Sequence, residues 1–373
     1  MSEEIKNVIK SYKYRIYPTK KQAELIDKTF GCCRYVYNMY LNKRIEIYES
    51  EKRTFKYKEC SKDLTIQKKS LTWLNEVDSS ALQNALKHLD ESYEDFFNKK
   101  SGFPKFKSKK KSRKSYTTKC NNNNIEYLGN YIKLPKLKKV KTKTKLIPKG
   151  KIMMATISKE PSGKYYVSLT CNNVPIKDFI KTNNNVGIDL GISEFLTMNN
   201  GKVIENPKYY RKLEKKLIKA QQALSRKKKG SNNYNKSRKK LAKIHEKIRN
   251  QRMDFINKTS TQIIKDYDII CIEDLQPKNM LKNHNLAKSI SDVSWSEFTK
   301  QLKYKAEWYG KKISKVDKFY PSSQICHSCG HKNIGTKDLK VREWTCPCCG
   351  IHNLRDVNAA INILTEGMKL INN

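Results

Sequence analysis

The sequence has 373 residues, which is enough for two or three domains and at least one well-buried core. Lys and Arg together number 78 and Asp and Glu number 36, so the formal net charge is +42. This charge indicates a polyanionic partner, and wholesale disorder is excluded because 37% of the residues are hydrophobic. Nucleic acid is favoured over an anionic membrane surface, since the basic residues are spread along the chain and are not gathered on one amphipathic helix.

Membrane segments and disulfides are both unexpected. No stretch approaches the apolar length needed to cross a bilayer, and the first residues lack the basic end and apolar run of a secretory signal. The eleven cysteines are an odd number, and five of them lie between residues 326 and 349, which favours a metal site over a disulfide framework. We therefore expect a cytoplasmic protein with no membrane contact.

The first hundred residues predict one strand followed by helices. Residues 12–17 alternate like a strand and stop at Pro18, after which Thr19 and Gln22 have the spacing of a capping box. Apolar residues at helical spacing continue the helix to about Tyr48. A second helix is expected from Ser79 or Ser80, with an apolar stripe that runs to residue 96.

Three segments carry dense positive charge. Residues 99–119 hold ten basic residues and no acidic one, with interleaved aromatic residues, and residues 133–151 are also free of acids. The third is the tip of a predicted antiparallel helix pair over residues 208–265, where residues 226–240 include eight basic ones. A solvated, partly disordered charge run is the simpler alternative, but the interleaved aromatics and strand-like neighbours favour contacts to phosphate.

From residue 186 onward the pattern changes to apolar strands, and a new domain is expected to begin near residue 181. In chain order we expect a strand at 186–192, a hairpin at 195–205, the helix pair, a strand at 267–273, a helix at 296–309, a strand at 312–316, a cysteine-rich insert and a last helix from about residue 356.

Three acids stand out in this half. Asp189 lies between two glycines in an apolar strand, and we expect those glycines to leave room for a metal ion and a phosphate. Glu273 closes a second apolar strand, whereas its neighbour Asp274 is interpreted as a turn cap. Asp356 heads the last helix, where a plain N-cap is a strong alternative for it alone. Together the three acids predict a shared divalent-metal site.

The acid trio suits hydrolysis of a phosphodiester. Two Mg²⁺ ions about 3.5 to 4 Å apart activate water and stabilise the leaving oxygen when carboxylates hold them, and Mn²⁺ could replace Mg²⁺ because hard oxygen ligands suit both ions. The sequence shows no phosphate-binding loop and no His-Glu-x-x-His motif as a competing centre. The site is therefore expected to be metal-dependent.

The cysteine-rich insert has the spacing of a zinc ribbon. Two Cys-x-x-Cys pairs, each followed by glycine, are separated by sixteen residues. Four thiolates would close a tetrahedral shell around one structural zinc ion, which leaves Cys348 as a spare thiol. The predicted ligands are Cys326, Cys329, Cys346 and Cys349.

In these motifs the chain resembles the transposon-encoded TnpB (OrfB) family, relatives of the type V CRISPR effector nucleases. The resemblance spans nearly the whole chain and rests on the segments at 12–18, 31–38, 102–107, 187–191, 272–275, 322–326 and 355–360. It implies a Mg²⁺-dependent, RNA-guided DNA endonuclease with a guide RNA and a double-stranded target that carries a short flanking motif. Asp189, Glu273 and Asp356 fall on the catalytic positions of the family.

The resemblance also implies an α+β multidomain fold: a β-barrel wedge domain with a helical recognition insert, an RNase H-like (RuvC) α/β nuclease domain and a zinc-ribbon insert. The corresponding boundaries are 1–20 and 101–180 for the wedge, 21–100 for the recognition domain, 181–320 and 353–373 for the nuclease, and 321–352 for the ribbon. A DNA substrate places the protein with the nucleoid of a prokaryotic or viral host. Whether it acts as a monomer or a dimer stays open.

Some residues are predicted to contact nucleic acid. Gln83 falls where the family contacts the flanking motif, although a capping box with Ser80 is an equal alternative. The other predicted contacts are Tyr116, Thr117, Lys105, Lys107, Arg226, Lys227 and Arg342.

One segment departs from the family. His-Asp-Arg-Asp usually precedes the last helix, and this chain has Asn353-Leu-Arg-Asp356, which keeps the final acid but loses two polar groups. Activity could therefore be reduced. A guided DNA-binding regulator with weak or no cleavage, and a transposase that transfers strands, remain the alternative functions.

Overall fold

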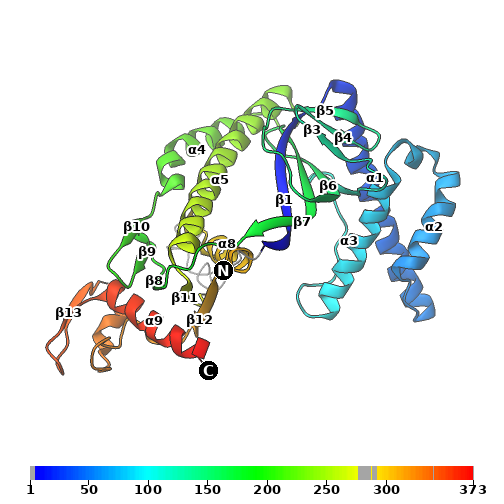
Figure 1. Ribbon diagram of the computed structural model, residues 1–373. Coiled ribbons are helices and arrows are strands. Elements are labelled where there is room, and N and C mark those ends of the chain that lie inside the picture. The colour runs from blue at the N-terminus through cyan, green and yellow to red at the C-terminus, as the bar shows by residue number, and fades with distance from the viewer. Residues whose placement is uncertain (1–4, 276–286, 288–291, 339, 373) are drawn as a thin grey trace. The chain divides into compact units, whose positions relative to one another are not determined.

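The computed structural model describes residues 5–275, 287, 292–338 and 340–372 (Figure 1). The chain forms two compact units. We call Asn7–Pro175 the N-terminal unit, and Ile176–Asn373 together with Met1–Lys6 the C-terminal unit. Sheets and helices occur in both, so the expected mixed α/β class is confirmed, whereas the barrel and the individual domain boundaries stay predictions. No helix of the described residues is long and apolar enough to span a bilayer.

A seven-stranded sheet organises the N-terminal unit, with strand order β2-β6-β7-β1-β5-β4-β3. Tyr12, Tyr14 and Ile16 are buried and alternate with exposed residues, as the sequence pattern predicts, although the strand already begins at Ile5. The strands are β1 (Ile5–Tyr17), β2 (Ser115–Lys119), β3 (Glu126–Leu128), β4 (Tyr131–Leu134), β5 (Lys138–Thr142), β6 (Lys151–Lys159) and β7 (Tyr165–Lys177).

Helices α1 (Lys20–Glu51) and α3 (Ser79–Phe97) form the helical part of this unit and pack against each other. The capping box is confirmed, since the Gln22 amide donates to Thr19 Oγ1 and the Thr19 amide donates to Gln22 Oε1. The alternative box of Ser80 with Gln83 is wrong. Asp78 caps α3 instead, and the Ser80 hydroxyl accepts a hydrogen bond from the Lys119 amide.

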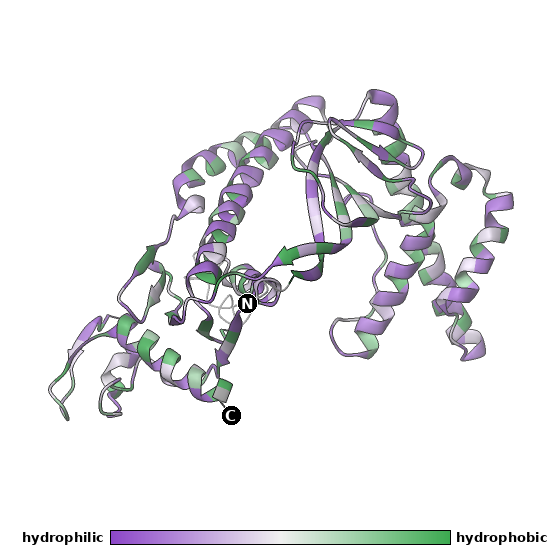
Figure 2. Cartoon of the chain, viewed as in Figure 1, coloured by the Kyte–Doolittle hydropathy of each residue, from purple (hydrophilic) through white to green (hydrophobic). Residues whose placement is uncertain are grey.

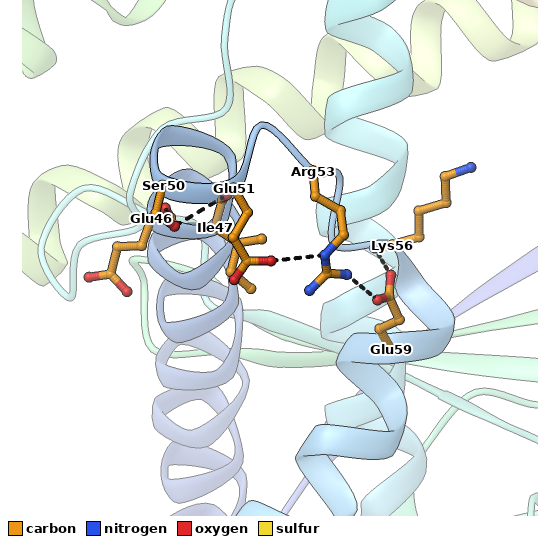
Figure 3. Close-up of polar contacts among 7 residues, drawn as sticks. All are labelled: Glu46, Ile47, Ser50, Glu51, Arg53, Lys56 and Glu59. Carbon is orange, nitrogen blue, oxygen red and sulfur yellow. Dashed lines mark hydrogen bonds and ion pairs between the residues drawn. The ribbon is translucent and has the colours of Figure 1, made fainter.

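Helix α2 (Tyr57–Ser70) and the short 3₁₀ helix η1 (Thr72–Glu76) were not expected from the sequence. Only Cys60 and Leu64 of α2 are buried, so its apolar periodicity is weak. Arg53 connects α1 to α2, because its guanidinium lies 3.1 Å from a Glu51 carboxylate oxygen and 2.5 Å from one of Glu59 (Figure 3). Such exposed ion pairs stabilise little and mainly fix the turn between the helices.

The C-terminal unit contains a five-stranded sheet with order β10-β9-β8-β11-β12. Strands β8, β11 and β12 are parallel, whereas β8, β9 and β10 form the expected antiparallel meander. Gly201, in the turn between β9 and β10, has φ +79°, a conformation that favours glycine. The strands are β8 (Asn185–Asp189), β9 (Glu194–Met198), β10 (Val203–Glu205), β11 (Ile269–Glu273) and β12 (Lys312–Val316).

Among the described residues of this unit are four long helices: α4 (Tyr209–Ser225), α5 (Asn232–Asp266), α8 (Trp295–Tyr309) and α9 (Arg355–Asn372). The predicted helix pair is α4 and α5, and Figure 2 shows hydrophilic residues over most of α5. Helix α8 packs on α5 and contributes Phe298 to the core around β8 and β11. It ends at Gly310, which has φ +68°, as the sequence predicts.

Helix α9 lies very close to the sheet, and this closeness explains Gly187. A Cβ atom at Gly187 would lie 2.0 Å from the carbonyl oxygen of Ala360 in α9. The expectation that this glycine leaves space for a metal ion and a phosphate is therefore wrong, because α9 fills that space. Gly367 makes the reverse contact, since a Cβ there would lie 2.5 Å from Cys271 Sγ in β11. The two glycines let α9 pack directly against β8 and β11.

Candidate metal centres

The structure brings the three predicted acids together. Asp189 and Glu273 are the last residues of the neighbouring parallel strands β8 and β11, and Asp356 lies in the first turn of α9. All three side chains are partly buried, so they remain accessible from solvent. Burial, followed by the negative charges of Glu273 and Asp356, raises the pKa of Asp189 to about 8. The three carboxylates therefore interact electrostatically.

Two arginines offset part of this negative charge. The charges of Arg355 and Arg342 act against the rise in the pKa of Asp189. Arg342 also pairs with Asp356, with Nη1 3.3 Å from Oδ2, and its Nη2 donates to Ser193 Oγ at 3.5 Å. Because both partners of this ion pair are more than a third exposed, the pair contributes little to stability. Arg342 can therefore exchange Asp356 for another anion at small cost.

The carboxylates suit a divalent cation of the hard type. Oxygen ligands are those that Mg²⁺ and Mn²⁺ prefer. A partly buried Asp189 next to two further acids is unfavourable in its charged form unless a cation lies among them. In the part of the chain that the structure describes, the three acids do not form a group whose ligand atoms all lie within 4.8 Å.

The raised pKa of Asp189 predicts a pH-dependent stability in the absence of Mg²⁺. An unfolded Asp titrates near about 4, so between about pH 4 and about pH 8 the folded chain binds a proton that the unfolded chain does not. The free energy of unfolding should therefore fall as pH rises through this window. We expect the Asp189→Asn protein to lose this contribution to the pH dependence. The difference in free energy of unfolding between the variant and the wild type should therefore grow, in favour of the variant, as the pH rises.

Urea unfolding of both proteins between pH 5 and pH 8, without Mg²⁺ and with zinc retained, measures this difference. A difference in free energy of unfolding between the two proteins that stays constant with pH would contradict the prediction.

A buried network of hydrogen bonds orients the Glu273 carboxylate, and the sequence analysis did not predict it. The Ser322 hydroxyl donates to Glu273 Oε1 at 2.5 Å and acts against the burial that raises the pKa of Glu273. Asn362 of α9 donates to the carbonyl oxygens of Ser322 and Ile325, at 2.8 and 2.6 Å. Asn358, one turn earlier, also donates to the Ile325 carbonyl, at 2.7 Å. The two asparagines on the buried face of α9 are the signal that could have indicated this network.

We expect Ser322→Ala to lower Mg²⁺ affinity or the Mg²⁺-dependent rate about 10- to 100-fold, the usual cost of removing an outer-shell partner. Ser322→Thr keeps the hydroxyl and should restore most of the loss. Ser323→Ala is the matched control, because Ser323 lies in the same segment but makes no hydrogen bond to Glu273. Titrating Mg²⁺ against the rate checks the prediction, and equal rates for the Ser322→Ala and Ser323→Ala proteins would contradict it.

The four predicted cysteines form a tight cluster, with all ligand sulfurs within 4.8 Å of one another. Cys326 Sγ lies 3.7 Å from Cys349 Sγ, and Cys329 Sγ lies 3.6 Å from Cys346 Sγ. Both pairs sit in the same kind of turn, in which the glycine amide donates to the carbonyl of the first cysteine. Gly330 and Gly350 have φ +77° and +71°, so each turn requires its glycine. Four sulfurs at this spacing fit one tetrahedral zinc ion.

Asn353, which replaces the usual histidine of the family pattern, supports this cluster. It is buried, its Nδ2 lies 3.8 Å from Cys326 Sγ and it also donates to the Ile351 carbonyl at 3.1 Å. Its Oδ1 lies 2.9 Å from His327 Nδ1, and this nitrogen is also 3.1 Å from Asn358 Oδ1. Thus His327 belongs to the network around the ribbon and not to the four sulfur ligands. Cys348 is exposed and lies outside the cluster, as expected.

The predicted nucleic-acid contacts lie in different surroundings. Gln83 Oε1 accepts hydrogen bonds from Tyr57 and Ser61, and Gln83 borders a cavity of about 400 Å³. Tyr116 and Thr117 of β2 are buried and border another cavity. The exposed predicted residues are Lys105, Arg226, Lys227 and Arg342, whereas Lys107 is half-buried. Their contacts to nucleic acid stay predictions.

Acids at the ends of parallel strands precede a four-cysteine cluster and a last helix that carries the third acid, an arrangement that suits a metal-dependent hydrolase. Three family models match the chain: "Probable transposase" (OrfB_IS605) over residues 170–284, "Cas12f1-like, TNB domain" over 295–363 and "Helix-turn-helix domain" (HTH_OrfB_IS605) over 7–53. The structure forms β1 and the single helix α1 over the last of these segments.

Curated relatives cover almost the whole chain. The "Putative RNA-guided DNA endonuclease" of Streptomyces pristinaespiralis is 40% identical over 98% of this chain and 90% of its own length. The "Putative RNA-guided DNA endonuclease InsQ" of Escherichia coli (strain K12) is 31% identical over 96% of this chain and 92% of its own length. "TnpB-like protein L79" of Acanthamoeba polyphaga mimivirus is 26% identical over 97% and 74%. The chain therefore belongs to the TnpB (OrfB) family, and the expected resemblance is confirmed.

A solved structure shares the fold. The chain in "Cryo-EM structure of the Cas12f1-sgRNA-target DNA complex" aligns with a TM-score of 0.60 and 15% identity, over 96% of this chain and 98% of that chain. At this sequence identity the match shows that the two chains share a fold.

Proposed function

We propose that this chain is an RNA-guided DNA endonuclease that hydrolyses phosphodiesters with two Mg²⁺ ions, or Mn²⁺ in their place. The observation that carries the proposal is the placement of the three acids: Asp189 and Glu273 end the neighbouring parallel strands β8 and β11, and Asp356 lies in the first turn of α9. Their charges act on one another and raise the pKa of Asp189, so cations among them favour the charged form. Family membership supports the guided activity, because two relatives above 30% identity are named RNA-guided DNA endonucleases.

In this proposal Asp189, Glu273 and Asp356 hold the Mg²⁺ ions. When bound, the ions supply an activated water and stabilise the leaving oxygen. Asp189 has to release its proton first, and Ser322 keeps a Glu273 oxygen in a fixed orientation. Arg342 leaves Asp356 and binds a phosphate oxygen of the substrate strand, for which its exposed guanidinium is suited.

One structural zinc ion in the ribbon is part of the proposal. The four cysteines would hold it in a closed shell, and no position is left for catalysis. Its role is to shape the segment that leads into α9, because the Arg355 amide donates to the Arg342 carbonyl at the junction. The ribbon thereby fixes both Arg342 and the start of the helix that carries Asp356.

The proposed partners are a guide RNA and a double-stranded target with a short flanking motif, in the cytoplasm of a prokaryotic or viral host. The net charge of +42 supports polyanionic partners. We assign residues 1–20 and 101–180 to the wedge domain, 21–100 to recognition, 181–320 and 353–373 to the nuclease domain and 321–352 to the ribbon. Gln83 is the proposed reader of the flanking motif, since Tyr57 and Ser61 donate to its carbonyl oxygen and no described residue accepts from its amide NH₂. Tyr116 and Thr117 would join it.

The test uses the full chain copurified with its own RNA. The RNA is sequenced, a duplex that matches it is placed next to a randomised flank, and cleavage is followed with and without Mg²⁺. Cuts in matched duplexes with one common flank support the proposal, and matched duplexes that stay intact reject it. Binding without cuts indicates a regulator, and joined transposon ends indicate strand transfer.

A further inference from the structure

A cavity of about 360 Å³ lies in the N-terminal unit between α1, α3 and the segment that leads into β2. Its floor is apolar and buried, with no side chain more than 8% exposed. The rings of Phe30 and Tyr116 in the floor lie at 61° to each other, with centroids 5.7 Å apart. The floor consists of Phe30, Cys33, Ala81, Ala85 and Tyr116.

The rim of the same cavity is strongly basic. Five cations and three serines border it, and no carboxylate does. None of the five cations forms an ion pair within residues 5–275, 287, 292–338 and 340–372. Burial lowers the pKa of Lys107, whose Nζ lies 3.6 Å from the centroid of the Tyr37 ring. The five cations are Arg34, Lys107, Lys109, Arg113 and Lys114.

Side chains of the protein fix this rim in place. The Asn38 side chain of α1 accepts from the Lys107 amide at 2.8 Å and donates to the Lys107 carbonyl at 2.9 Å. Two serines then close the following turn, since the Ser108 amide donates to Ser112 Oγ and the Lys111 amide donates to Ser108 Oγ. The basic segment over the cavity is thus ordered before any ligand binds, unlike a solvated charge run.

We infer that this cavity binds one unpaired nucleotide, with its base on the apolar floor and its phosphate among the cations of the rim. A nucleotide combines a flat ring of low polarity with an anion, as the floor and rim require. The cavity is concave and walled by several segments, so a base enters only after it leaves a duplex stack or where it was never paired. The inference rests on the proposed function, which supplies an RNA and a DNA strand as the two sources of such a nucleotide.

Abasic nucleotides test the inference directly. The full chain is bound to its RNA and target, and each strand in turn carries a single abasic residue at successive unpaired positions. We expect one position to lower affinity roughly tenfold, the order of magnitude of one lost base contact. If that position lies in the RNA, the bound nucleotide comes from the RNA. If it lies in the DNA, the bound nucleotide comes from the target. Flat affinities in both series would overturn the inference.

Matched charge variants separate the cavity from diffuse attraction. Lys109→Ala and Arg113→Ala remove rim cations, whereas Lys110→Ala and Lys111→Ala remove exposed cations of the same segment that do not border the cavity. We expect only the rim variants to weaken binding and to abolish the effect of the abasic position. Equal losses from all four variants would overturn the inference.

A third variant, Ala85→Leu, narrows the floor and keeps every charge. Thermal unfolding shows whether the Ala85→Leu protein folds. If it does not fold, the inference is judged from the Lys109→Ala and Arg113→Ala proteins alone. A folded Ala85→Leu protein should lose the abasic effect, and one that keeps it in full would count against the inference. Cleavage by the wild-type complex is recorded in the same preparations. A wild type that binds but never cuts rejects the proposed function and leaves these binding comparisons valid.

Discussion

Replacing Asp189 with Asn is expected to reduce target cleavage by more than about a hundredfold, because changes in outer-shell partners of metal ligands already cost about 10- to 100-fold. The change is nearly isosteric and removes a carboxylate that burial and two neighbouring acids disfavour in its charged form. Folding and binding of RNA and target should therefore persist. Single-turnover cleavage at saturating target, together with a binding titration, separates the two effects.

The matched control is Asp274→Asn, the same change of acid to amide immediately after Glu273. Asp274 is 46% exposed and pairs with Lys315 at 2.8 Å, and it is not among the groups that shift the pKa of Asp189. It should cut at close to the wild-type rate. An Asp189→Asn protein that cuts as fast as this control would remove the basis for a carboxylate-held metal site.

Replacing Cys346 with Ser is expected to eliminate tight zinc binding and to unfold the ribbon. Structural zinc contributes an apparent free energy of about 10 to 16 kcal/mol to small zinc domains at neutral pH, which is larger than any other contribution available to this segment. The described ribbon contains one small apolar cluster of Cys326, Trp344 and Cys346, and two of its members are proposed zinc ligands. Zinc content by mass spectrometry and limited proteolysis of residues 321–352 measure the loss.

Cys348→Ser provides the control, because Cys348 is exposed, lies in the same turn and is outside the sulfur cluster. It should keep one zinc ion per chain and the resistance of the wild type to proteolysis. Cleavage of target DNA should fall with Cys346→Ser and not with Cys348→Ser. Full zinc content in the Cys346→Ser protein would exclude the four-sulfur site.

Local patterns in the sequence were sufficient to find the acids and the cysteines. Glu273 ends an apolar strand, and the two Cys-x-x-Cys pairs define their own geometry through the turns at Gly330 and Gly350. These features depend on neighbours in the chain, so the sequence carries them directly. The same holds for the capping box of Thr19 and Gln22.

Features that depend on distant partners were missed or wrong. Gly187 is required by the carbonyl of Ala360, a residue of α9 that no local pattern connects to it. The Ser80 hydroxyl bonds to the Lys119 amide, and Asp78 caps α3 in its place. Ser322 binds Glu273 through a fold-dependent contact. In each case the deciding partner comes from another element, and tertiary packing overrides the local signal.

The acids that lie together at the ends of β8 and β11 and the start of α9 come from widely separated stretches of chain. Contacts between such remote segments form late, because the intervening loops must be ordered first. A chain truncated before α9 would keep only two of the three carboxylates, Asp189 and Glu273. We therefore expect hydrolytic activity to appear only once the sheet, the ribbon and the final helix have assembled.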